Sequence, residues 1–124
     1  MKANELRIGN YVKYYYQVMS IDIPEYKIED GADIQVHENF KVFEPIPLTE
    51  EWLLKFGFNI KEAVWFSKKT KAVWIRLEVS IKKKRCILFD TKGINYCDIL
   101  FPKSVHELQN IYFVLTGKEL TQKL

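Results

Sequence analysis

Strict alternation of apolar and polar residues marks one segment of the chain as a strand. Between residues 73 and 82, apolar side chains occupy the odd positions, and the even positions hold Trp74, Arg76, Glu78, Ser80 and Lys82. A period of two sends alternate side chains to opposite faces of a sheet, so one face should meet a core and the other should be wet or partly wet. Apolar stretches at about 63–67, 85–90 and 94–100 flank this strand, and residues 63–100 therefore predict an antiparallel meander.

The first 43 residues predict further strands. The parity of the apolar positions changes between residues 12–18 and 19–23, and a strand cannot change its apolar face without a bulge or a turn. We therefore expect two short strands with a break near residues 15–17. Another strand is expected over about 33–43, after a turn at 29–32. These N-terminal strands are compatible with a small SH3-like barrel.

Two segments carry the end signals of helices. Thr49 is a good N-cap for a short helix over about 50–56, and Gly57 suits the position just past its end. Apolar residues on both sides of the cap form a hydrophobic staple, which places Trp52 in the core.

The second helix follows Ser104, which we expect to form a capping box with Glu107, and it ends at Gly117. Its core-facing stripe has helical spacing and consists of Val105, Leu108, Ile111, Tyr112 and Leu115. The order of strands, helix, strands and helix predicts an α+β fold, an antiparallel β-meander with two helices, in a single domain over residues 1–124.

Composition excludes several classes of protein. The 124 residues are 48% hydrophobic and 15% aromatic, which is too apolar for a disordered chain. Two cysteines cannot form a disulfide scaffold, so Cys86 and Cys97 are expected as reduced, buried thiols. The first residues lack the apolar stretch of a signal peptide, and the apolar runs are too short to span a membrane. The predicted location is the cytoplasm.

The search for catalytic and metal-binding motifs returns none. The five glycines are too far apart for a phosphate-binding loop. His37, His106, Cys86 and Cys97 are not at metal-ligand spacing, and we expect two buried thiols and two surface imidazoles. A Cys97–His106 dyad is conceivable, but nothing in the sequence marks the thiol as activated. The sequence therefore predicts a protein that is not an enzyme and uses no metal or other cofactor.

Charge is distributed unevenly along the chain. Residues 1–62 contain seven basic and eleven acidic residues, whereas residues 63–124 contain twelve and five. The oppositely charged halves can attract each other within one fold or assemble copies of the chain head to tail. The basic half can also present a basic face to an anion.

The basic residues of the second half gather in two expected hairpin turns, at 67–71 and 82–85. The candidate binding residues are Lys68, Lys69, Lys71, Trp74, Arg76, Lys82, Lys83, Lys84, Arg85 and Lys92. Clustered lysines beside aromatic residues favour nucleic-acid contact. Successive turns of a meander lie at opposite ends of the sheet, so the turn that carries Lys92 should join the first cluster. The alternative is that lysine-rich turns only keep hairpin tips soluble and block edge pairing.

Three stretches together resemble a known family. They are residues 4–10 (NELRIGN), 45–58 (PIPLTEEWLLKFGF) and 105–120 (VHELQNIYFVLTGKEL). They are similar to a family of short proteins from prophages and mobile elements of gut Bacteroidetes. The resemblance implies a cytoplasmic accessory protein of a phage or mobile element, and it assigns no activity, cofactor or functional residue.

Two functions follow as hypotheses. The first is a protein-interaction module that binds a protein partner or self-associates, through an edge strand or through the surface around Tyr14–Tyr16 and Phe113. The second is a nucleic-acid-binding protein that uses the basic turns. Neither hypothesis requires a membrane or a small-molecule cofactor.

Overall fold

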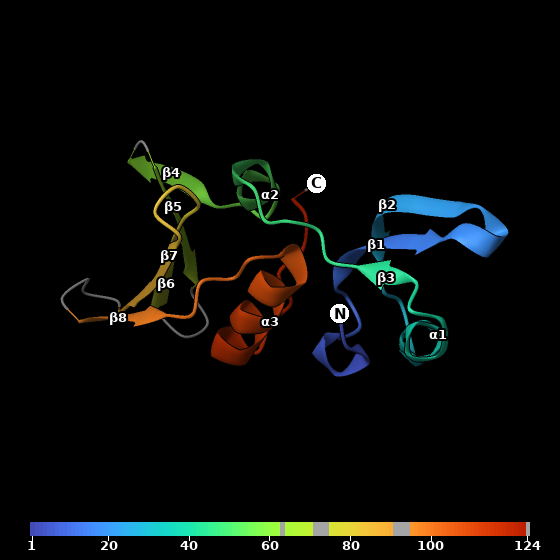
Figure 1. Ribbon diagram of the computed structural model, residues 1–124. Coiled ribbons are helices and arrows are strands. Elements are labelled where there is room, and N and C mark those ends of the chain that lie inside the picture. The colour runs from blue at the N-terminus through green and yellow to red at the C-terminus, as the bar shows by residue number, and fades with distance from the viewer. Residues whose placement is uncertain (63, 71–74, 91–94, 124) are drawn as a thin grey trace.

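The computed structural model describes residues 1–62, 64–70, 75–90 and 95–123. These residues form an α+β fold with two antiparallel sheets and three α-helices (Figure 1). The first sheet has the order β2-β1-β3, and its strands are β1 (Tyr11–Tyr16), β2 (Ile21–Lys27) and β3 (Phe43–Glu44). The second is a meander of β4 (Asn59–Glu62), β5 (Trp65–Thr70), β6 (Ile75–Ser80), β7 (Arg85–Phe89) and β8 (Tyr96–Ile99).

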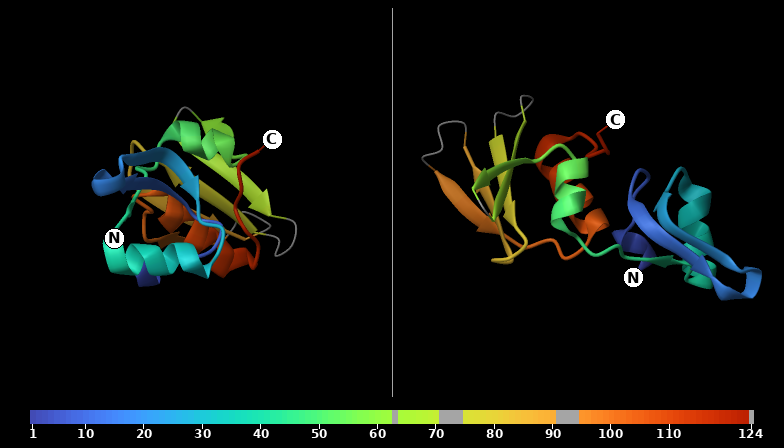
Figure 2. Two further views of the ribbon diagram at one scale, coloured as in Figure 1. Left: turned by 90° about the vertical axis from the view of Figure 1, so that its right-hand side faces the viewer. Right: turned by 90° about the horizontal axis from the view of Figure 1, so that it is seen from above.

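The three helices are α1 (Gly31–Phe40), α2 (Glu50–Lys55) and α3 (Val105–Thr116). Two short 3₁₀ turns precede β1 and β2, namely η1 (Ala3–Glu5) and η2 (Gln17–Met19). Figure 2 shows the three-stranded sheet and α1 at one end of the molecule, the meander at the other, and α2 and α3 between them. The described strands close no barrel, so an SH3-like relation of the N-terminal strands stays a prediction. None of the described helices has the length and apolar character needed to cross a bilayer.

The predicted strand over 33–43 is wrong, because residues 31–40 form α1. Asp30 is the N-cap, and its carboxylate accepts a hydrogen bond from the Asp33 N–H at 3.1 Å. This cap stabilises a helix that the alternation of apolar residues did not indicate. The expected break in the first hairpin also moves. The β1–β2 register shifts between Val12 and Tyr14, and η2 forms the connection.

A small core cluster lies under the three-stranded sheet and consists of Leu6, Val12, Ile28, Val42 and Phe43. His37 is buried beside it, which corrects the expectation of a surface imidazole. Its Nδ1 accepts a hydrogen bond from the Phe43 N–H at 2.9 Å, and its Nε2 lies 2.8 Å from the Met1 carbonyl oxygen. Because Nδ1 accepts, Nε2 carries the proton and donates to that carbonyl. His37 is therefore a satisfied core residue.

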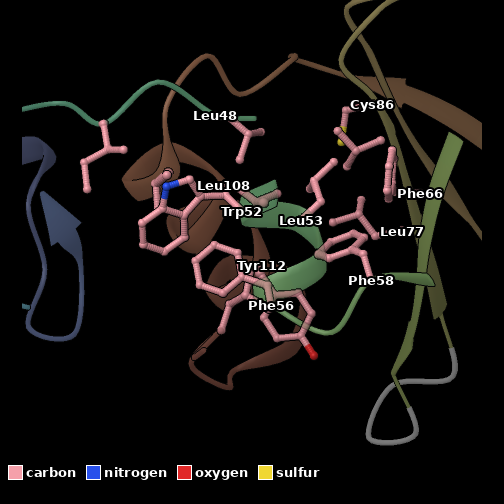
Figure 3. Packing of buried hydrophobic residues seen from close by; sticks show 14 residues of the cluster. Leu48, Trp52, Leu53, Phe56, Phe58, Phe66, Leu77, Cys86, Leu108 and Tyr112 are labelled. Carbon is pink, nitrogen blue, oxygen red and sulfur yellow. The ribbon is translucent and has the colours of Figure 1, made fainter. Parts of the chain in front are cut away.

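A larger core cluster lies between the meander and the helices α2 and α3. Trp52 is 6% exposed, as the staple predicts, and Phe66, Leu77 and Cys86 point from the sheet toward the helices (Figure 3). Cys86 is thus a buried thiol, and burial, aided by the charge of Asp98, raises its pKa to about 12. Cys97 is exposed, contrary to expectation, because it lies on the edge strand β8.

Both ends of α2 form as predicted. Thr49 Oγ1 accepts a hydrogen bond from the Trp52 N–H at 3.4 Å. Gly57 has φ +86°, a conformation that favours glycine, and the Phe58 N–H reaches back to the Leu53 carbonyl at 3.0 Å. This is the hydrogen-bond pattern of a Schellman motif, so α2 ends where the glycine predicts.

The capping box predicted for α3 does not form. Ser104 Oγ lies 3.1 Å from His106 Nδ1 instead of bonding the helix backbone. Glu107 Oε2 accepts from the Lys103 N–H at 3.1 Å, one residue earlier than the motif requires. The helix still begins at Val105, because its apolar stripe packs into the large core. Gly117 ends the helix as predicted, with φ +71°.

Gln109 of α3 connects this helix to the N-terminal segment and to the chain after α3. Its side chain is fully buried and makes three hydrogen bonds to backbone groups. Oε1 accepts from the Tyr11 N–H at 2.8 Å, while Nε2 donates to the carbonyls of Gly9 at 2.9 Å and Leu120 at 3.0 Å. One amide thus satisfies backbone polar groups that burial would otherwise leave unpaired.

Asn110 extends this contact on the neighbouring helical position. Its Oδ1 accepts from Arg7 Nη1 at 2.7 Å and from Asn10 Nδ2 at 3.0 Å, and its Nδ2 donates to the Glu5 carbonyl at 2.8 Å. Arg7 also pairs with Glu119. The segments 4–10 and 105–120, which carry part of the family resemblance, are therefore in direct contact.

Candidate nucleic-acid interface

The face of the meander turned away from α2 and α3 carries aromatic and basic side chains, and we call it the outer face. Phe66, Leu77 and Cys86 mark the inner face (Figure 3), and alternation along each strand places their neighbours on the opposite side. The strand registers align the outer-face residues in rows. They are Trp65, Ser67 and Lys69 of β5, Arg76, Glu78 and Ser80 of β6, Arg85, Ile87 and Phe89 of β7, and Tyr96 and Asp98 of β8.

One group of side chains on this face and its adjoining turn, which we call the turn cluster, lies where β6 passes into β7. Its members are Trp65, Lys82, Lys83, Lys84 and Arg85. Lys83 Nζ lies 5.8 Å and Arg85 Cζ 5.9 Å from the centre of the Trp65 ring. These distances are at the outer limit of cation–π contact, so two positive charges lie close to the Trp65 ring.

The geometry of the turn keeps its lysines in solvent. Lys82, Lys83 and Lys84 are all exposed, and the Lys83 N–H donates to Ser80 Oγ at 3.2 Å, which holds the turn. Arg85 begins β7 and donates from Nη2 to Asp98 Oδ1 at 2.9 Å. Asp98 therefore orients the guanidinium and neutralises part of its charge, whereas the three lysines carry the free charge of the cluster.

A second group, the Phe89 cluster, lies further along the same face and contains Lys61, Arg76, Glu78, Phe89 and Tyr96. Arg76 Cζ lies 4.6 Å and Lys61 Nζ 5.5 Å from the centre of the Phe89 ring. The Tyr96 ring is 5.8 Å from that of Phe89, and Tyr96 is 64% exposed. An aromatic ring with cations nearby is the common feature of both clusters; the Trp65 and Phe89 rings are half-buried, and Tyr96 is exposed.

Glu78 sets the electrostatics of the Phe89 cluster. It is only 4% exposed, and its Oε2 lies 2.8 Å from both Lys61 Nζ and Arg76 Nε. The Arg76 Nε–H does not point at this oxygen, so that contact is a charge pair and not a hydrogen bond. Because one carboxylate faces two cations, the Phe89 cluster keeps a net positive charge.

Lysine and arginine side chains also line a pocket beside β4 and β5. Its volume is about 530 Å³, and the basic residues of the described chain on its wall are Lys61, Lys68, Lys69 and Arg76. The register pairs Lys69 with Arg76 on the outer face, whereas Lys68 reaches the same pocket from the inner face of β5.

The predicted position of Lys68 in a hairpin turn is wrong, and its binding role stays a prediction. Lys68 and Lys69 belong to β5 and not to a turn, and Lys68 is half-buried with its Nζ donating to the Phe56 carbonyl at 3.0 Å. Burial, and then the nearby charge of Lys123, lower the pKa of Lys68. The Lys68 ammonium pairs with a carbonyl at the C-terminal end of α2, so it has a structural partner within the fold.

The other predicted site residues divide into two sets. Lys69, Arg76, Lys82, Lys83, Lys84 and Arg85 lie on the outer face or its adjoining turn, whereas Lys71, Trp74 and Lys92 lie outside the described residues. This face of β6, expected to be wet or partly wet, is partly covered, because Glu78 and Ser80 are buried and Arg76 is half-buried. Long neighbouring side chains cover this part of the strand.

The turn cluster and the Phe89 cluster are separate from each other. Arg76 pairs with Phe89 and Ser80 with Arg85 in the β6–β7 register. These rows are four residues apart along each strand, which corresponds to about 13 Å at about 3.3 Å per residue. A ligand that contacts both clusters must therefore be extended.

Sequence reasoning missed Trp65, Phe89, Tyr96 and Lys61. Trp65, Phe89 and Tyr96 lie on strands that the sequence predicted, whereas Lys61 lies on β4, which falls outside the meander predicted over residues 63–100. Alternation around residues 65–69 and 85–89 could have placed Trp65 and Phe89 on the face opposite the core. Their proximity to the cations depends on the register between strands, which the sequence does not specify.

Comparisons of the chain with protein-family models, curated proteins and solved structures find no match.

Proposed function

We propose that the protein binds single-stranded nucleic acid across the outer face of the meander. The observation that supports this function best is the pairing of an aromatic ring with cations at two points of one sheet face. Bases stack on exposed aromatic rings, and lysine and arginine neutralise the phosphates between them. An extended strand of nucleic acid fits a separation of about 13 Å between the two clusters better than a compact ligand does.

Charge supports the same proposal. Residues 59–100, which contain the meander, carry ten basic and four acidic residues. The acidic Glu78 and Asp98 are engaged by arginine or lysine. A sheet platform presents ring faces to unstacked bases, as single strands require, whereas duplex reading uses elements that enter a groove.

The test is a fluorescence-anisotropy titration with random single-stranded DNA and RNA oligomers at 50 and 200 mM salt. Contact with three or four phosphates should reduce the affinity by about 1.3 to 1.7 decades between these salt concentrations. Absence of binding at 50 mM salt would overturn the proposal.

Variants locate the binding face. Reversing charge at Lys82, Lys83 and Lys84 together should abolish binding with little change in the melting temperature, because all three side chains are exposed. The matched control reverses Lys27, Lys41 and Lys118, which are exposed and lie off the meander. Equal loss in both triple variants would show attraction to overall charge and not to this face.

A protein-interaction module remains the second candidate function. It is favoured by an exposed apolar patch at the tip of the first hairpin, where Val18 is 82%, Met19 66% and Phe40 57% exposed. Tyr16 links hairpin and helix, because its ring lies 5.8 Å from that of Phe40. Apolar patches of this kind mark contact surfaces.

The candidate partner of this patch is a second copy of the chain. Sedimentation equilibrium of the wild type and of a Met19→Glu, Phe40→Glu double variant tests it. A monomer at all concentrations would exclude self-association, and dissociation in the double variant would assign the patch. The place of the protein in a phage or mobile element, its cytoplasmic location and its lack of enzymatic activity stay predictions.

A further inference from the structure

The first turn of α3 and the 3₁₀ turn η1 bring three potential metal ligands together. Glu5 belongs to η1, and His106 and Glu107 begin α3. One imidazole nitrogen and one oxygen from each carboxylate all lie within 4.8 Å of one another. Figure 1 shows η1 beside α3, and the hydrogen bond from Asn110 Nδ2 to the Glu5 carbonyl, at 2.8 Å, holds the two segments together.

The two carboxylates are positioned by backbone groups. Glu5 Oε2 accepts from the Lys2 N–H at 2.7 Å, and Glu107 Oε2 accepts from the Lys103 N–H at 3.1 Å. Each bond fixes one oxygen of its carboxylate, and the other is available to a further ligand. Two carboxylates also outweigh the partial positive charge at the start of α3, which alone would repel a cation.

His106 provides an independent sign of a ligand. The residue is 1% exposed, and its Nε2 is buried without a hydrogen-bond partner. The nearest carboxylate oxygen, Glu5 Oε1, is 3.8 Å away, which is too far for a hydrogen bond. A buried polar atom without a partner costs free energy, and nearly all such atoms in folded proteins are satisfied.

The tautomer of His106 suits metal binding. Ser104 Oγ lies 3.1 Å from Nδ1 and can accept a hydrogen bond from the Nδ1–H. In that tautomer the lone pair is on Nε2, which lies 3.8 Å from Glu5 Oε1. Second-shell contacts of this kind orient the imidazoles of metal sites. Burial lowers the pKa of His106 against the opposing charges of Glu107 and Glu5, which favours the neutral imidazole that a metal ion requires.

We propose that Glu5, His106 and Glu107 bind one divalent transition-metal ion of the zinc type. An imidazole nitrogen with two carboxylate oxygens is a donor set that zinc accepts, whereas calcium and magnesium prefer oxygen alone. Ligand distances of about 2.0–2.2 Å place neighbouring donor atoms about 3.3 Å apart. The three donors, now within 4.8 Å of one another, would move closer together to bind the ion, with Ser104 orienting the imidazole.

The test uses protein without an affinity tag, freed of metal with EDTA and dialysed, and titrated with ZnCl₂ in a calorimeter. The background carries Cys97→Ser, because the exposed thiol could bind zinc by itself. One equivalent should bind, and Co²⁺ in place of Zn²⁺ should give a visible absorption band. Absence of zinc binding at micromolar concentrations would overturn the proposal.

Single variants assign the ligands without disturbing the core. Glu5→Gln and Glu107→Gln should each weaken zinc binding at least about tenfold, because loss even of an outer-shell partner has an effect of this order. Glu38→Gln, an exposed glutamate of α1, is the matched control and should bind as the parent does. Undiminished binding by the Glu5→Gln, Glu107→Gln double variant would place the ion elsewhere and refute this site.

Discussion

The Oε1 atom of Gln109 accepts a hydrogen bond from the backbone N–H of Tyr11, 2.8 Å away, across 98 residues of chain. The same amide also bonds the Gly9 and Leu120 carbonyls. This side chain connects α3 to the first strand, and the Tyr11 ring packs on Trp52 and Phe56 immediately beside it. The small core and the large core therefore meet at this point.

Replacing Gln109 with alanine should lower the free energy of unfolding by about 2–5 kcal/mol, because three buried backbone groups lose their partner. Urea denaturation followed by tryptophan fluorescence measures the change. Gln35→Ala, at an exposed position of α1, is the control and should alter stability by no more than about 0.5 kcal/mol. A cost for Gln109→Ala as small as that of the control would contradict the proposed joint.

Trp52→Ala should cost about 3–5 kcal/mol, because it removes a large buried side chain and leaves a cavity. The Trp52 ring contacts those of Tyr11 and Phe56, with centroids 5.6 and 5.4 Å away. Thermal unfolding of Trp52→Ala beside Trp65→Ala gives the comparison, since Trp65 is half-buried on the outer face. Trp52→Ala should lower the melting temperature clearly more than Trp65→Ala does. Equal losses would be inconsistent with this assignment of the core.

Lys68→Met should destabilise the protein by about 1–2 kcal/mol, because the Phe56 carbonyl loses a charged donor. Lys69→Met removes the same charge from an exposed neighbour on the same strand and should have an effect below about 0.5 kcal/mol. Chemical denaturation of both variants separates the two lysines. If Lys69→Met were the more damaging change, Lys68 would not cap α2.

The two cysteines should differ in reactivity. At pH 8 a disulfide reagent should label Cys97 rapidly in the folded protein, whereas Cys86, whose pKa burial raises to about 12, should react only after unfolding. The reagent releases a coloured thiolate that counts the reactive groups. Rapid labelling of a Cys97→Ser variant would show that Cys86 is accessible.

The same thiol makes stability depend on pH. In the unfolded chain Cys86 ionises near about pH 8.5, but in the folded protein its pKa is about 12. The folded state therefore binds more protons between these values, and stability falls as pH rises above about 8.5. From pH 8 to 10 the wild type should lose about 2 kcal/mol more than Cys86→Ala. Parallel urea curves at both pH values would show whether this difference exists.

The sequence predicted what local patterns encode. Alternation over residues 73–82 predicted the meander, and Thr49 with Gly57 predicted both ends of α2. The strand expected at 33–43 is a helix, because Asp30 caps it and His37 takes a core position that a polar residue does not indicate. Local spacing has no information on such tertiary partners.

The candidate site was predicted in part for the same reason. Lysine clusters are visible in the sequence, but the rings that accompany them come from other strands. Trp65 reaches Lys83 and Arg85 only through the registers of β5, β6 and β7. Lys68 shows the converse, because its role depends on the position of the α2 carbonyl beside it.

The contact of Gln109 and Asn110 with residues 5–11 has a consequence for synthesis of the chain. A ribosome makes the N-terminal strands first, but their partners on α3 follow about one hundred residues later. Nascent chains that end before residue 105 cannot complete this joint, so their first hairpin should remain open to proteases. The emergence of α3 from the ribosome would then be the event that commits the N-terminal half to its final structure.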